Sequence, residues 1–243
     1  MNIKLTVEYD GTNYHGWQFQ ANGESIQAVL ERAVSTFLGT PTRVIGSGRT
    51  DAGVHALGQV ANFLAGREVD LHKLRRGLNA LTPHDITIKE VEMVADSFDA
   101  RRDGRSRVYE YLILNRPTPS PFFLKRAWHL HEPLDAEAMR QAIPCLLGEH
   151  DFSSFRAAGC DAAHPVRKVY RTSLEQRNEL LVYTIEATAY LRHMVRNIVG
   201  TLVDVGLGLR TPQSFAELLE ARDRTKAGQT APACGLYLME VKY

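Results

Sequence analysis

The sequence predicts a mixed α+β fold of two ferredoxin-like α/β halves that share an extended, mostly antiparallel sheet. Three observations support this fold class. Each half mixes helices and strands in a roughly β-α-β-β-α-β order, and the connections between paired strands are short, which favours antiparallel pairing. With 44% apolar and 23% charged residues, the 243-residue chain can also bury an ordinary core.

The first elements follow from the spacing of apolar side chains. Residues 3–9 alternate apolar and polar side chains, which predicts a half-buried strand. Residues 10–23 are rich in Gly and Asn and predict a loop. Residues 25–38 carry an apolar stripe with a 3.6-residue period, and Gly39 is placed to end the helix that this stripe predicts.

The rest of the first half predicts a hairpin, a helix and a strand. A short strand, a glycine turn and a second strand near residues 58–63 follow the first helix. Residues 71–81 place leucines on one helical face. Residues 86–94 predict a strand, and the apolar phase slips after Ile88, which allows a β-bulge.

The second half opens with a predicted strand at residues 106–114 and a proline-rich loop at residues 115–126. Residues 135–148 look helical, although Pro144 should kink or end the helix. Residues 156–165 predict a loop. The remaining expected elements are strands at 166–174 and 179–189, helices at 190–208 and 214–222, and a strand at 235–243.

We expect two subdomains with an active-site cleft between them. The first, residues 1–104, carries a catalytic Asp loop, and the second comprises residues 105–243. The boundary is placed in the polar, basic segment around Asp103–Ser106.

Composition excludes several classes of protein. No run of 18 apolar residues exists, so no transmembrane helix is expected, and the N-terminus lacks the features of a signal peptide. The three cysteines are an odd number without a CxxC pair, which favours reduced thiols in the cytoplasm over disulfides or a zinc ribbon.

Charge is nearly balanced, with 29 Lys and Arg against 28 Asp and Glu. The balance alone gives no reason to expect nucleic acid, but the arginines cluster. Each cluster can be a solvated charged surface, or the neutral chain can carry a basic cleft. The candidate phosphate contacts are Arg101, Arg102, Arg105, Arg107, Lys125, Arg126 and Arg167.

The stretch Arg43–Phe63, RVIGSGRTDAGVHALGQVANF, turns on glycines and then presents several polar side chains. A P-loop would need a Gly-Lys pair, but Gly48 is followed by Arg49. A dinucleotide fingerprint would need a third glycine at Asp51, where a carboxylate would repel a pyrophosphate. Asp51 and His55 alone do not make a metal site, so we expect no metal.

Asp51 on this glycine turn allows two interpretations. It can be a structural residue that caps a backbone N–H. It can also be a carboxylate presented at the wall of a cleft, where it acts as a nucleophile or a general base.

At this point several motifs carry a family resemblance. GSGRTDAGVHALGQVANF resembles the signature of tRNA pseudouridine synthases of the TruA type. RVYEYLI, LRHMVRNIVGTL and APACGLYL resemble the later motifs of that family, and YDGTNYHGWQFQ with GESIQAVLERA resembles its N-terminal region. The matches occur in the right order from residue 5 to residue 240, nearly the whole chain.

The resemblance implies a pseudouridine synthase fold and an isomerase that converts uridine to pseudouridine at positions 38, 39 and 40 of the tRNA anticodon stem-loop. It implies no cofactor and no metal, tRNA as the partner, and a homodimer. A pseudouridine synthase acting on another RNA, or a tRNA-binding module without chemistry, remain the alternatives.

The resemblance also implies the site residues. Asp51 is the catalytic Asp, Tyr109 the tyrosine that stacks on the uracil or exchanges a proton, and Arg196 the basic residue that pairs with Asp51. Arg49 is the rival partner of Asp51, or helps to flip the target base. The remaining substrate-binding candidates are Thr50, His55, Leu236, Arg101, Arg105 and Arg107, and His55, Gln59 and Asn62 are also expected to brace the Asp51 loop.

Overall fold

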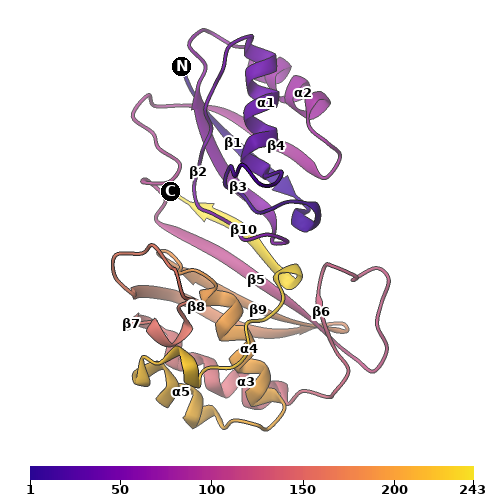
Figure 1. Ribbon diagram of the computed structural model, residues 1–243, viewed down its shortest axis with the longest axis vertical. Helices are drawn as coiled ribbons and strands as arrows, with labels where there is room; N and C mark the ends of the chain where they lie inside the picture. The colour runs from indigo at the N-terminus through magenta and orange to yellow at the C-terminus, as the bar shows by residue number, and fades with distance from the viewer. The chain divides into compact units, whose positions relative to one another are not determined.

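The computed structural model describes residues 1–243 (Figure 1). The chain forms two compact units, one of Met1–Arg105 with Tyr237–Tyr243 and the other of Ser106–Leu236. The sequence placed the boundary one residue earlier and assigned the C-terminal strand to the second half. That strand, β10 (Leu236–Lys242), pairs in parallel with β3 (His55–Leu64), and this pairing places its residues from Tyr237 onward in the first unit.

The sheet of the first unit is mostly antiparallel. Its strand order is β4-β1-β3-β10, with β1 spanning Asn2–Tyr9 and β4 spanning Ile86–Val94. Both β1 and the two-residue strand β2 (Ile45–Gly46) pair antiparallel with β3. The predicted hairpin therefore exists, with a β3 that begins three residues earlier than expected.

Two helices of this unit lie side by side, as Figure 1 shows. Helix α1 (Ile26–Leu38) begins where the Ser25 side chain accepts a hydrogen bond from Ala28 N–H, and it ends at Gly39, whose φ of 75° is left-handed. Helix α2 (Leu71–Leu81) begins at Asp70, which accepts from two backbone N–H groups. Both helices match the predicted periodicity.

The expected bulge lies in β4. Its register against β1 shifts so that Val7 faces Ile88 and Thr6 faces Glu90, which leaves Lys89 as the extra residue. The Asn79 side chain on α2 supports this point, because its amide donates to the Ile88 carbonyl at 3.0 Å and accepts from Ile88 N–H at 2.7 Å.

The sheet of the second unit has the order β6-β5-β9-β8-β7 and is antiparallel except for the β5–β6 pair. The sequence did not predict the short strands β6 and β7. The strands span Ser106–Asn115 (β5), Trp128–Leu130 (β6), Gly148–Asp151 (β7), Val166–Arg177 (β8) and Leu180–Ala187 (β9).

Three α-helices of the second unit pack against one another. Helix α3 (Ala136–Ala142) gives way to a 3₁₀ turn that contains Pro144, as Pro144 predicted. The other two helices are α4 (Met194–Gly206) and α5 (Pro212–Ala221). The 3₁₀ turns of the chain are η1 (Gly11–Asn13), η2 (Ile143–Leu146), η3 (Ser153–Phe155), η4 (Arg224–Lys226) and η5 (Ala233–Gly235).

The prediction that α4 begins at residue 190 was wrong. The helix begins at Met194, because His193 has a left-handed φ of 60°. The Tyr190 hydroxyl is instead bonded to strand carbonyls, which holds this segment off the helix axis. The mixed α+β class with mostly antiparallel strands is confirmed. None of the helices has both the length and the apolar character needed to cross a membrane.

Candidate active site

Asp51 lies in the turn that joins β2 to β3. The buried Gln59 side chain makes two hydrogen bonds to this turn. Its Oε1 accepts from the Ser47 hydroxyl at 2.7 Å, and its Nε2 donates to the Gly48 carbonyl at 3.1 Å. Gln59 therefore braces the loop as the sequence analysis expected. Asp51 is half-buried, and its neighbour Arg49 is exposed.

Thr50 is directed inward. Its hydroxyl lies 2.8 Å from the Tyr9 hydroxyl in a buried contact, and its carbonyl accepts from Trp17 N–H at 3.0 Å. Burial raises the pKa of Tyr9 to about 12, although the hydrogen bonds with Thr50 and Gln59 act the other way. Tyr9 therefore stays a neutral phenol, and Thr50 is a support of the turn rather than a surface group.

The backbone of the loop before α1 presses against this turn. A Cβ atom on Gly16, whose φ is +85°, would lie 2.4 Å from the Thr50 carbonyl oxygen. A Cβ atom on Gly11 would lie 2.0 Å from the Val54 carbonyl oxygen. Only glycine permits such close approach, so the two segments hold the Asp51 turn in one conformation.

His55 begins β3 and is buried, with 2% of its surface exposed. Its Nδ1 accepts from Gly11 N–H at 3.1 Å and lies 3.1 Å from a carboxylate oxygen of Asp10. Its ring stacks on Tyr237 of β10 with centroids 4.7 Å apart. These contacts favour the bracing role of His55 over direct contact with a substrate.

In the second unit, Arg107, Tyr109 and Tyr111 lie on one face of β5, since alternate residues of a strand face the same side. Tyr111 is fully buried, and its hydroxyl donates to the Pro232 carbonyl at 2.7 Å. Burial raises the pKa of Tyr111, followed by the effect of the nearby Cys234, while Arg196 lowers it. Tyr111 is thus a core aromatic, with Arg196 in its surroundings.

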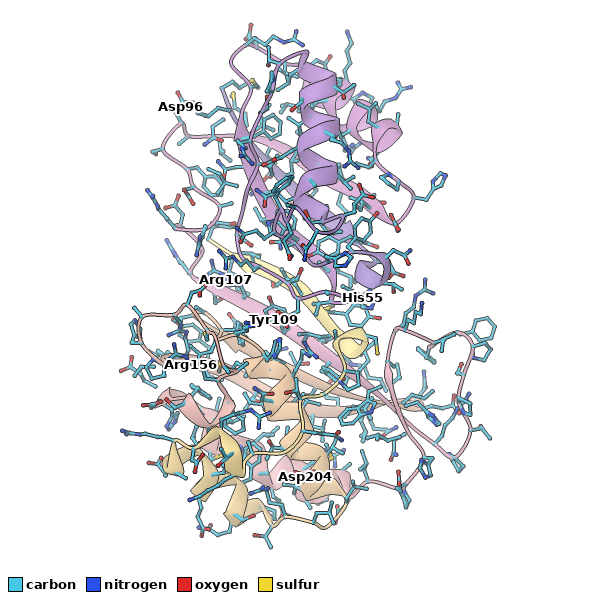
Figure 2. The ribbon with its side chains drawn as sticks, in the orientation of Figure 1. His55, Asp96, Arg107, Tyr109, Arg156 and Asp204 are labelled. Carbon is cyan, nitrogen blue, oxygen red and sulfur yellow. The ribbon has the colours of Figure 1, made fainter.

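Tyr109 is 9% exposed, and its ring meets the ring of Tyr190 edge to face at 4.9 Å (Figure 2 labels Tyr109 and Arg107). The Tyr190 hydroxyl lies 3.0 Å from the carbonyl oxygens of both Arg107 and Ile185. Burial raises the pKa of Tyr190 well above its usual value, and Tyr109 adds to the rise. Sequence reasoning missed Tyr190, because it placed this residue on the apolar stripe of a helix.

Arg196 projects from the first turn of α4 and is half-buried. Its Nε donates to the Ala231 carbonyl at 2.8 Å, and Ala231 N–H donates back to the Arg196 carbonyl at 3.1 Å. The Arg196 guanidinium is therefore oriented by the segment that precedes η5 rather than extending freely into solvent.

Leu236, at the start of β10, is 6% exposed.

A partly buried polar network around the buried Asn197 holds the segment that precedes η5 across α4. Arg224 donates to the side-chain oxygens of Asn197 and Thr230, both at 3.1 Å, and Thr230 donates to Asn197 at 2.6 Å. A Cβ atom on Gly200 would lie 1.7 Å from the Gln229 carbonyl oxygen, so the segment touches the helix backbone directly. The network positions Ala231, and through it Arg196.

The basic candidates divide by exposure. Arg101, Arg102 and Arg105 are exposed, whereas Arg107 is half-buried and its Nη1 donates to the Thr188 carbonyl at 2.9 Å. Arg107 belongs to the second unit, as do the three candidates that follow it in the chain. Of these, Lys125 and Arg126 are exposed. Arg167 is half-buried, and its Nη1 donates to the carbonyls of His164 and Val166.

The structure thus groups the predicted site residues into two sets. Arg49, Thr50, Asp51 and His55 lie together in the first unit, and Tyr109, Arg196 and Leu236 lie in the second. No group of three or more His, Cys, Asp or Glu side chains has an arrangement that could hold a metal ion.

A family model described as tRNA pseudouridine synthase matches residues 5–102 and 142–243. The chain belongs to this family, whose members are isomerases, which confirms the family resemblance and the class of enzyme.

Relatives that match along nearly the whole chain carry the same family description. The chain is 48% identical to "tRNA pseudouridine synthase A" of Myxococcus xanthus over 242 residues, which covers 99% of this chain and 91% of the relative. It is 47% identical to the protein of the same description from Pelobacter propionicus, with 99% of each chain covered. The relative from Thermoanaerobacter sp. (strain X514) is 44% identical and covers 100% of this chain.

Proposed function

We propose that this enzyme isomerises uridine to pseudouridine in tRNA, at positions 38, 39 and 40 of the anticodon stem-loop. The observation that carries the proposal is the Asp51 turn: the Gln59 side chain and the loop before α1 hold the backbone around the half-buried Asp51 in one conformation. Membership of the tRNA pseudouridine synthase family supports the reaction and the class of RNA. The three positions rest on the resemblance of the motifs.

The reaction needs a carboxylate beside the ribose. The bond between C1′ and N1 of uracil breaks, the freed ring rotates, and a bond between C1′ and C5 forms. The proton on C5 is lost and N1 gains one, so the product is an isomer. Asp51 acts at the sugar, by attack on C1′ or by removal of a proton from C2′.

The second residue set acts on the base. Tyr109 stacks on the detached uracil, and its edge contact with Tyr190 keeps the ring in place. Leu236 supplies an apolar surface under the base. Arg196, whose Nε donates to the Ala231 carbonyl, supplies the cation that pairs with Asp51.

The target nucleotide must leave its stack to reach these groups, at a cost of about a few kcal/mol. The exposed Arg49 beside Asp51 is placed to assist this extrusion, and Arg101, Arg105 and Arg107 bind tRNA phosphates. Binding through phosphates releases counterions, so tRNA affinity should fall steeply with salt.

Asp51→Asn tests the catalytic assignment. We expect tritium release from C5-labelled uridine in tRNA to be abolished while tRNA affinity stays within about twofold, because the amide keeps the shape and loses the charge. Asp96→Asn is the matched control, since Asp96 is an exposed carboxylate of the same unit. Unchanged tritium release in Asp51→Asn would sink the assignment.

Mapping of pseudouridine in tRNA from cells that lack the protein tests the substrate. Loss of the modification at positions 38 to 40 alone supports the proposal. If these positions remain modified and another RNA loses pseudouridine, the enzyme class stands and the substrate assignment fails.

We also propose a cytoplasmic homodimer. The dimer rests on the resemblance of the motifs, and the cytoplasm on three cysteines that are all free thiols in the structure. Sedimentation equilibrium tests the dimer: a mass that stays at one chain at micromolar concentration would contradict it.

A further inference from the structure

Three arginines of the second unit gather at the loop that joins η3 to β8, residues 156–165. Arg156 lies in the loop, Arg167 follows at the start of β8, and Arg192 comes from the segment before α4. Arg192 is exposed, whereas Arg156 and Arg167 are half-buried (Figure 2 labels Arg156). We call these three residues the arginine cluster. Only Arg167 is among the phosphate contacts that the sequence predicts.

Backbone carbonyls orient all three guanidinium groups. The Nη2 of Arg156 donates to two loop carbonyls at 2.7 and 3.0 Å. The Nη1 of Arg167 donates to two carbonyls at 2.6 and 2.9 Å, and the Nη1 of Arg192 lies 3.4 and 3.5 Å from two more. A carbonyl oxygen is a neutral acceptor, so these bonds position the guanidinium groups and leave their positive charge uncompensated.

The arginine cluster carries an excess of positive charge. No carboxylate forms an ion pair with any of its members, and the buried Nε of Arg167 has no partner. Residues 156–171 contain four Lys or Arg against a single acidic residue, Asp161. Burial lowers the pKa of Arg167, Cys160 acts the other way, and the nearby charge of Arg156 adds to the fall. These cations are therefore close enough to repel one another, and a bound anion would relieve that repulsion.

The Cys160 thiol lies within this loop and responds to the same charges. The N–H group of Arg192 donates to its Sγ at 3.4 Å. Burial acts to raise the pKa of the thiol, but the N–H groups of Arg192 and Ala162 and the Arg156 side chain outweigh burial and lower it. The loop thus stabilises a negative charge on sulfur, and it would stabilise a negative charge on a ligand in the same way.

The arginine cluster is fastened to the helix that carries Arg196. The Asn197 side chain donates to the Phe155 carbonyl at 2.8 Å, and Ala157 N–H donates to the Arg192 carbonyl at 3.0 Å. Arg192 precedes Arg196 by four residues. An anion bound by the cluster is therefore held on the segment that also presents a residue of the proposed site.

We infer that the arginine cluster is a binding site for phosphate groups of the RNA backbone. Guanidinium groups suit this ligand, because their N–H donors pair with two phosphate oxygens at a time. An RNA is favoured over an acidic protein segment because the cluster is attached to the helix of Arg196. The inference rests on the proposed function for the identity of the RNA.

The salt dependence of tRNA affinity tests the site, with unmodified tRNA and the Asp51→Asn enzyme as the parent. Arg167→Gln and Arg192→Gln should each reduce the magnitude of the slope of log affinity against log salt by roughly 0.7 to 0.9, because one phosphate contact is lost. At 0.1 M salt that change corresponds to binding that is roughly five- to eightfold weaker. Arg192→Lys should keep most of the slope, since it keeps the charge. An unchanged slope in both Gln variants would overturn the inference.

Arg177→Gln is the matched control. Arg177 lies at the other end of β8, where Glu110 and Glu175 compensate its charge, so its removal should leave the slope as in the parent. Arg192 is exposed, so Arg192→Gln should fold as the parent does and its result stands by itself. A smaller sedimentation mass for Arg192→Gln without RNA, with an unchanged slope, would overturn the inference and assign the cluster to subunit contact.

Alkylation of Cys160 provides a second measurement, at the loop itself. Saturating unmodified tRNA should slow the labelling of Cys160 by iodoacetamide and leave the labelling of Cys145 unchanged, because phosphates on the arginine cluster cover the loop and disfavour the thiolate. Equal rates for Cys160 with and without tRNA would overturn the inference.

Tritium release by the wild-type enzyme keeps the two proposals distinguishable. An active enzyme whose salt slope and Cys160 labelling do not respond as expected overturns only the phosphate site. A wild-type chain that binds tRNA through the arginine cluster but releases no tritium overturns the proposed reaction and supports the phosphate site.

Discussion

At the residue scale, one cation on the mostly apolar helix α4 supports the proposal beside the Asp51 turn. Arg196 follows Met194 and Val195, which are both buried, and its guanidinium is held by the Ala231 carbonyl. A half-buried arginine in such surroundings needs polar partners, since an unpaired buried charge is costly. The family resemblance pointed to the residue, but only the fold shows that the segment before η5 orients it.

Arg196→Met should lower tritium release by more than its effect on stability explains, because the variant removes the cation that the proposal pairs with Asp51. Arg196→Lys is the matched control, because it keeps the charge and should retain part of the activity. Full activity in Arg196→Met would assign the pairing to Arg49.

The three cysteines should differ in reactivity. Burial raises the pKa of Cys145 to about 11, and burial also raises the pKa of Cys234. Burial acts in the same direction on Cys160, but the N–H groups of Arg192 and Ala162 and the Arg156 side chain outweigh it and lower that pKa.

Because the thiolate is the nucleophile, iodoacetamide at pH 7.5 should label Cys160 before the other two cysteines. Mass spectrometry of peptides from the intact enzyme measures the order, and Cys160→Ser should remove the fast phase. Labelling of Cys145 at the same rate as Cys160 would contradict the prediction.

At the scale of elements, local sequence determines where helices α1 and α2 begin, whereas contacts with distant strands determine where α4 begins. Helices α1 and α2 begin at side chains that accept backbone hydrogen bonds and keep one apolar face, and both features are local. Helix α4 starts late because Tyr190 bonds to carbonyls of Arg107 and Ile185, and a periodicity argument does not contain those partners.

Two glycines in helices give a matched pair of predictions. Gly200→Ala places a Cβ atom 1.7 Å from a backbone carbonyl oxygen and should destabilise the fold by about 1–3 kcal/mol. Gly77→Ala meets only the ring of Phe37, at 2.5 Å, and this half-buried side chain can move. Thermal unfolding measures both, and equal losses would contradict the explanation.

The Gly200 variant also tests how Arg196 is positioned. Displacement of residues 227–231 should reduce tritium release by more than the loss of stability explains, measured well below the unfolding temperature. Activity equal to that of the wild type at that temperature would show that the polar network of Asn197, Arg224 and Thr230 does not act on the site.

At the scale of the whole molecule, the C-terminal strand completes the first unit. Met239 of β10 approaches Gly58 so closely that a Cβ atom there would lie 2.4 Å from its carbonyl oxygen. Tyr237 stacks on His55, which itself contacts the loop before α1. A strand at the end of the chain therefore supports the turn that carries Asp51.

Removal of Tyr237–Tyr243 should destabilise the enzyme by at least about 3 kcal/mol, because Leu238 and Val241 are buried and each contributes about 1.5 kcal/mol or more. Hydrogen exchange of the β3 amides should quicken in the same variant. Removal of Tyr243 alone is the control and should leave β3 protected. Protected β3 amides after the longer truncation would show that β10 is dispensable.

The sequence by itself determined most of the elements, because helix periodicity and strand alternation are local properties, and the resemblance of its motifs supplied the candidate site residues. It missed β6 and β7, which are three and four residues long and carry no clear alternation. Only the tertiary structure decided the partner of β10, the start of α4 and the roles of His55, Tyr190 and Ala231. These depend on pairings between residues more than 30 positions apart for Arg196 and Ala231, and more than 180 apart for His55 and Tyr237. Such pairings form only when burial brings distant segments together, and no local pattern encodes them.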